Sequence, residues 1–139
     1  MSTQYLTGVL QTGAPRTAGV PVDARHGLQI VQGETLTLIM RVLTPNGVPV
    51  PVAGRDFRLS IRRNPRDMTS LYGSIGSVRP DLGVEYWQFV VPFETTVNFR
   101  PGVLCYDVWT RLVDDRESLI PTSPLYVSAA AGFGMLEPT

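Results

Sequence analysis

The chain has 139 residues, 43 % of them hydrophobic, and a formal net charge of zero. This composition suits one folded domain with an appendage and excludes a disordered chain. The neutral charge without a basic run argues against nucleic-acid binding, and no apolar run approaches the roughly 18 residues of a membrane span.

Twelve prolines and thirteen glycines favour a β protein with many turns. All twelve basic residues are arginine. A GC-rich coding sequence explains this bias, and selection for contact surfaces, where arginine is favoured over lysine, is compatible with it. Cys105 is the only cysteine, so an internal disulfide is excluded, and its apolar neighbours indicate a structural thiol.

Residues 1–27 show no sustained period, and repeated glycines and prolines exclude a long helix. The segment nevertheless carries apolar side chains, among them Tyr5, Leu6, Val9 and Leu10. We interpret it as an extended arm that lies on a neighbouring subunit, with a loose terminus as the alternative. It lacks the features of a secretory signal, so we expect synthesis in a cytoplasm.

From residue 28 apolar and polar residues alternate, as is typical of half-buried strands. Strands are predicted over 28–31, 35–43 and 56–62. In the last of these, Arg58 and Arg62 lie on the polar face, either as solvated surface or as contacts to a neighbouring protein.

The segment between the second and third strands combines conflicting signals. Asn46-Gly47 is a strong hairpin turn signal, yet Pro49 and Pro51 cannot donate ladder hydrogen bonds. We interpret the segment as an extended edge or crossover that bends at Gly54 into the second sheet.

The second half of the chain continues the β pattern. Its predicted elements are one or two short edge strands within 68–83, a strong strand over 84–91 and a short helical turn or loop over 92–102. A long strand over 103–113 follows, and a strand over 118–127 returns, with prolines that mark an edge. In the long strand, Trp109 lies on the outer face and is a candidate contact residue, unless the arm or tail covers it.

These elements amount to about seven strands, the pattern of an all-β, immunoglobulin-like β-sandwich. The predicted sandwich spans residues 28–127, after the arm. Residues 128–139 form a short C-terminal tail with an apolar cluster that includes Phe133.

The sequence holds no catalytic, cofactor-binding or metal-binding pattern. His26 is the only histidine, which argues against a catalytic triad or a histidine-rich metal site. The acids at 114, 115 and 117 are interpreted as solvated charge in a turn. We therefore expect a protein that is not an enzyme.

Several motifs, in order and spacing, resemble small β-sandwich proteins of tailed-bacteriophage virions. They are similar to the N-terminal domain of phage upper-baseplate proteins, and the resemblance covers about residues 28–127. The matching residues are Gly33, Glu34 and Thr35, then Asn46, Gly47, Pro49, Val50 and Gly54, then Phe57, Leu59, Ile61 and Arg62, and finally Pro101, Gly102, Leu104, Tyr106, Asp107 and Val108.

The resemblance implies a structural protein that is located in the virion and made in the host bacterial cytoplasm, with other virion proteins as partners. Upper-baseplate proteins continue into a long fibre-like region that this sequence lacks. We therefore expect a capsid decoration (cement) protein that binds assembled major capsid subunits, as a homo-oligomer or bound to the lattice. A baseplate or tail-fibre attachment adaptor is the alternative, and a carbohydrate-binding host-attachment module is a more remote one. Removal of residues 1–27 is expected to leave the domain folded but to abolish its binding to the lattice.

Overall fold

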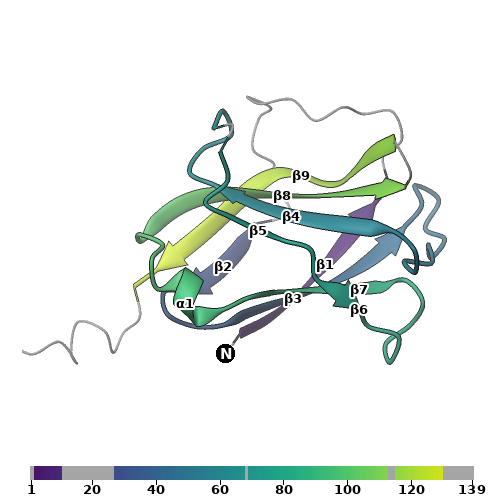
Figure 1. Ribbon diagram of the computed structural model, residues 1–139, viewed down its shortest axis with the longest axis horizontal. Helices are drawn as coiled ribbons and strands as arrows, with labels where there is room; N and C mark the ends of the chain where they lie inside the picture. The colour runs from purple at the N-terminus through teal and green to yellow at the C-terminus, as the bar shows by residue number, and fades with distance from the viewer. Residues whose placement is uncertain (1, 11–26, 68, 113–114, 130–139) are drawn as a thin grey trace, which may run out of the picture.

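Two β-sheets stack face to face in the computed structural model, with β8 and β9 in one layer and β3 and β7 in the other (Figure 1). The structure describes residues 2–10, 27–67, 69–112 and 115–129. The expected all-β sandwich is confirmed. Within the described residues it has nine strands, against the expected seven.

The first sheet has four strands in the order β1-β3-β7-β6. They are β1 (Ser2–Val9), β3 (Leu36–Leu43), β7 (Tyr86–Val91) and β6 (Ser77–Val78). β3 pairs with β7 in the antiparallel direction, whereas β1 pairs with β3 in parallel.

The second sheet has five strands in the order β2-β9-β8-β4-β5. They are β2 (Leu28–Val31), β9 (Asp115–Ser128), β8 (Gly102–Leu112), β4 (Asp56–Arg62) and β5 (Tyr72–Ser74). The short helix α1 (Phe93–Thr96) connects β7 to β8 at one end of the sandwich (Figure 1), where the sequence predicts a helical turn or loop.

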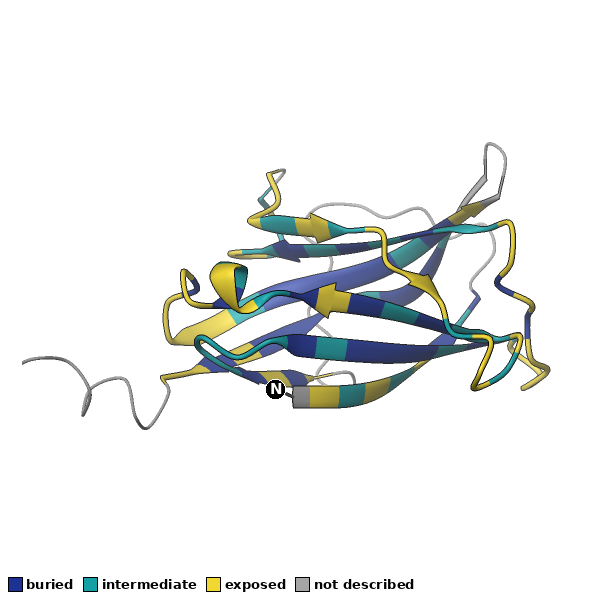
Figure 2. Ribbon diagram, turned by 60° about the horizontal axis from the view of Figure 1, so that its bottom comes forward, coloured by how far each residue is buried: buried dark blue, intermediate teal, exposed yellow. Residues whose placement is uncertain are grey.

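The core lies between the two sheets, and Figure 2 shows buried residues alternating with more exposed ones along the strands of both layers. The alternation predicted for the first half of the chain is confirmed, because Leu38, Met40, Phe57 and Leu59 are all buried. The rings of Phe57 and Trp87 meet across the core at a centroid distance of 4.5 Å. This ring pair is a direct contact between the two sheets and helps to hold them together.

β1 differs from the expected free arm. Residues 2–9 form a complete parallel ladder with β3, and Leu10 continues into the core. β1 also approaches the core closely at Gly8, where an added Cβ would lie 3.1 Å from the Met40 sulfur. The prediction of an arm is therefore wrong for residues 2–10, because their apolar side chains and a glycine fit this chain's own sandwich. Residues 11–26 lie outside the described residues.

The side chain of Gln4 connects the edges of the two sheets. Its amide nitrogen donates to the backbone carbonyl of Gln29 in β2, and its amide oxygen accepts a hydrogen bond from the Gln29 backbone nitrogen at 3.3 Å. Gln29 thus has both backbone groups satisfied by a side chain from the other sheet.

The proline-containing segment after β3 crosses between the sheets as predicted. The Val50 nitrogen donates to the Val42 oxygen, and the Val52 nitrogen donates to the Val84 oxygen. Both valines are buried, while Pro49 and Pro51 face solvent. The prolines thus occupy the positions where no donor is needed.

The prolines of β9 were expected to mark an edge. β9 lies instead between β2 and β8, although β2 pairs only with its last residues, 125–128. Pro121 lies where the β8–β9 register shifts, between the Tyr106 and Val108 pairings. A bulge accommodates a proline because the ladder is already interrupted there.

The crossing from β5 to β6 closes the other side of the sandwich. The Trp87 indole nitrogen donates to the Ile75 carbonyl at 2.9 Å. Next to it, Gly76 has a φ of 74° and packs against β7, so that an added Cβ would lie 2.1 Å from the Gln88 carbonyl oxygen.

Gly76→Ala is expected to lower the free energy of unfolding by about 2–5 kcal/mol, since it combines a left-handed backbone with a clash against β7. The midpoint of urea unfolding measures this loss. Gly73→Ala is the matched control, because its nearest contact would be the Leu59 oxygen at 3.7 Å. Equal midpoints for the two variants would contradict the assigned packing of Gly76.

Candidate protein-interaction site

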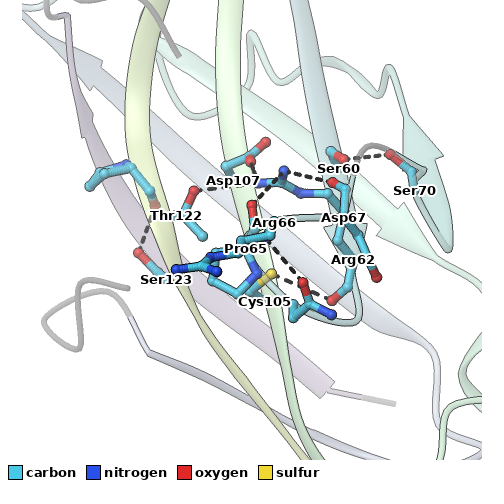
Figure 3. A network of polar contacts seen from close by, with 12 residues as sticks. Ser60, Arg62, Pro65, Arg66, Asp67, Ser70, Cys105, Asp107, Thr122 and Ser123 are labelled. Carbon is cyan, nitrogen blue, oxygen red and sulfur yellow. Dashed lines mark hydrogen bonds and ion pairs between the residues drawn. The ribbon is translucent and has the colours of Figure 1, made fainter. Parts of the chain in front are cut away.

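Arg62 joins a network of polar contacts on the outer face of the second sheet (Figure 3). Its guanidinium forms an ion pair with Asp107 of β8 and donates to the backbone oxygens of Pro65 and Asp67, at 3.3 Å and 3.2 Å. A further hydrogen bond of 3.4 Å reaches Thr122 of β9. One side chain therefore connects three strands to the loop after β4.

The Arg62–Asp107 pair is largely removed from solvent. The Asp107 side chain is 4 % exposed and that of Arg62 is 13 % exposed. The Nε atom of Arg62 is buried and has no hydrogen-bond partner among the described residues, so one donor of the network is unsatisfied within them. The polar contacts of Arg62 are thus made within its own chain, and they hold the loop after β4 at Pro65 and Asp67.

Arg58 and Trp109 are cross-strand neighbours on the same outer face. Arg58 pairs with Asp56 at 3.1 Å and stays partly exposed. Trp109 is half-buried, and its partner in β9 is Ser118. Contact with another protein at these two residues remains a prediction.

The remaining predicted contact residues do not share one surface. Tyr5 is 71 % exposed on the first sheet, whereas Leu10 is buried in the core. Leu6 packs partly buried against the core, and Val9 is half-buried. Phe133 lies outside the described residues. Tyr5 is therefore the one member of this N-terminal group that is available to a partner.

A groove of about 700 Å³ lies at the α1 end of the sandwich, and sequence reasoning missed it. Its walls come from the ends of β4 and β5, the segment over 94–101 and the start of β8. Arg63 and Arg100 both line it. The one available signal in the sequence was the exclusive use of arginine, which does not indicate where the groove lies.

Internal hydrogen bonds hold both walls of the groove. The buried Thr96 hydroxyl donates to the Glu34 carbonyl at 2.8 Å and accepts from the Gly33 nitrogen. The Gln32 amide donates to the Phe99 carbonyl at 3.0 Å. On the opposite wall the Tyr72 hydroxyl donates to a backbone oxygen of β7. The groove is thus formed before any partner binds.

Thr96→Val is expected to lower the free energy of unfolding by about 1–3 kcal/mol, because it leaves a buried carbonyl and a backbone N–H without their partner. Thermal or urea unfolding measures the loss. Thr95→Val is the control, since the neighbouring hydroxyl is half-buried and makes no side-chain hydrogen bond in the described part of the chain. A loss of similar size in the control would contradict the role given to Thr96.

Chemically reactive groups are few in the residues that the structure describes. Burial raises the pKa of the Cys105 thiol, which favours the unreactive protonated form. Over residues 2–10, 27–67, 69–112 and 115–129 no group of three potential metal ligands gathers. Glu117 pairs with Arg55 at 3.4 Å, and Asp114 lies outside the described residues. No helix in this part of the chain is long and apolar enough to cross a membrane.

Comparisons with known proteins show a likeness in fold. No protein-family model and no curated protein sequence matches the chain. Among solved structures, it is similar to the N-terminal domain of phage TP901-1 ORF48, with a TM-score of 0.51 and 11 % identity. The match covers 92 % of this chain and 99 % of that chain. What the two share is the fold.

Proposed function

We propose that this chain is a non-enzymatic structural protein of a tailed-phage virion that acts by binding other virion proteins. The observation that carries the proposal is the similarity of nearly the whole chain to the N-terminal domain of a phage protein. The motif resemblance to virion sandwich proteins, noted in the sequence, supports the same reading independently. The rigid sandwich with a preformed groove is suited to docking on a partner.

Within the virion, we favour a baseplate or tail-fibre attachment adaptor over the capsid decoration expected from the sequence. The motifs resemble N-terminal domains of upper-baseplate proteins, and the similar solved structure is also an N-terminal domain of a phage protein. The expectation of decoration rested on the missing fibre-like region and on an apolar arm that lies on a neighbouring subunit. Residues 2–10 of that arm belong instead to the sandwich, which weakens the case for decoration.

Location and copy number in purified particles test the proposal. Quantitative mass spectrometry, with antibody labelling seen by electron microscopy, is expected to find about six to a few dozen copies at the tail end, as the rotational symmetry of tails implies. Hundreds of copies on the shell would establish decoration instead. Absence of the chain from particles would refute a virion role.

A further inference from the structure

Two arginines in the groove form no ion pair with any residue that the structure describes. Of the nine arginines whose side chains the structure describes, six form ion pairs with carboxylates, namely Arg41, Arg55, Arg58, Arg62, Arg79 and Arg111. The other three are Arg63, Arg66 and Arg100, and two of these line the groove. The groove therefore gathers cationic side chains that this part of the chain does not neutralise.

The single acid among the described lining residues is Glu94, so the arginines outnumber the carboxylates in the groove. A guanidinium presents its N–H donors as a planar fork that matches the two oxygens of a carboxylate. Charge complementarity thus favours a ligand that carries carboxylates.

Apolar side chains surround these charges. Val103 is 62 % exposed and Leu71 is 41 % exposed, and both line the groove. Tyr126, the cross-strand partner of Val103, is 42 % exposed beside it. Exposed apolar residues next to arginine are typical of surfaces that bind protein, whereas a site for a small anion needs no such border.

We propose that this groove receives an acidic segment of a neighbouring virion protein, with Arg63 and Arg100 binding its carboxylates and Val103 and Leu71 contacting its apolar side chains. The inference rests on the proposed function, because it names the chemistry of the partner. The fixed walls reduce the ordering cost on binding, since only the partner segment has to become ordered.

Site-specific photo-cross-linking in assembled particles tests the contact. A chain with p-benzoylphenylalanine in place of Val103 is packaged during infection, irradiated, and the linked peptide is sequenced by mass spectrometry. We expect a segment of another virion protein that contains Asp or Glu residues. The control places the cross-linker at Val48, which is similarly exposed but does not line the groove, and is expected not to label that segment.

Charge reversal tests the arginines separately. Arg63→Glu combined with Arg100→Glu is expected to reduce the copies per particle by about tenfold or more, because the reversed charges repel the carboxylates of the partner segment. A tenfold loss of affinity corresponds to about 1.4 kcal/mol. Arg66→Glu is the matched control, an exposed arginine without an ion pair in the described residues and outside the groove. Circular dichroism and thermal unfolding check that the wild-type chain, the double variant and the Arg66→Glu control are folded.

The outcomes separate the inference from the proposed function. Particles that contain the chain but give no cross-link from position 103, or a link to a segment without acids, overturn the acidic occupant and leave the virion role intact. Equal packaging of the double variant and the Arg66 control does the same. Particles that lack the wild-type chain overturn both.

Discussion

Deletion of residues 1–10 is expected to destabilise the sandwich by at least about 5 kcal/mol, comparable with the whole stability of a small domain. The deletion removes the eight-residue ladder with β3, the core side chain of Leu10 and the backbone that covers Met40 and Leu119 at Gly8. It also leaves β3 as a long unpaired edge, which promotes aggregation. Urea unfolding and size-exclusion chromatography measure both effects.

A point substitution tests the packing of β1 against the core without removing any residue of the strand. Gly8→Val is expected to cost about 1–3 kcal/mol, because its Cβ would press against Met40 and Leu119. Thr7→Val, on the exposed face of the same strand, is the control. Wild-type stability of the deleted chain would restore the interpretation of residues 1–27 as a free arm.

Asp107→Ala is expected to destabilise the protein by about 3–5 kcal/mol, because it leaves the buried guanidinium of Arg62 without its counter-charge. The hydrogen bonds from Arg62 to Pro65 and Asp67 depend on the position of that guanidinium, so the loop after β4 is expected to loosen as well. The urea midpoint reports the stability, and hydrogen exchange over residues 63–70 reports the loop.

Two controls identify the buried charge as the cause. Asp81→Ala removes a carboxylate from the exposed pair with Arg79 and is expected to leave the urea midpoint close to that of wild type. Arg62→Met combined with Asp107→Leu is expected to cost less than the sum of the two single substitutions, because no unpaired charge is left buried. Additive costs would refute the coupling between Arg62 and Asp107.

The strand faces were predictable because alternation is a local property. Leu38 and Met40 point inward for the same reason as Phe57 and Leu59, and each pattern is visible in a few consecutive residues. The turn at Asn46-Gly47 and the proline crossover were likewise predictable, since turn chemistry depends on the residues in the turn.

Contacts between distant strands were not predictable in the same way. The parallel pairing of β1 with β3 joins residues more than thirty positions apart, as in the Ser2–Leu36 pair, and β1 itself shows no sustained period. Alternation placed Arg62 on an outer face, but only the register of β4 with β8 makes it a diagonal neighbour of Asp107. The groove combines the ends of three strands with the 94–101 segment, so it exists only in the folded chain.

The contact between Gln4 and Gln29 has a consequence for how copies of the chain associate. A side-chain amide occupies the donor and the acceptor that β2 would offer to an incoming strand, much as another peptide unit would. When two copies meet at the β2 edge, the backbone donor and acceptor of Gln29 are already occupied by Gln4. Pairing of β2 with a strand of another copy is therefore disfavoured at this position.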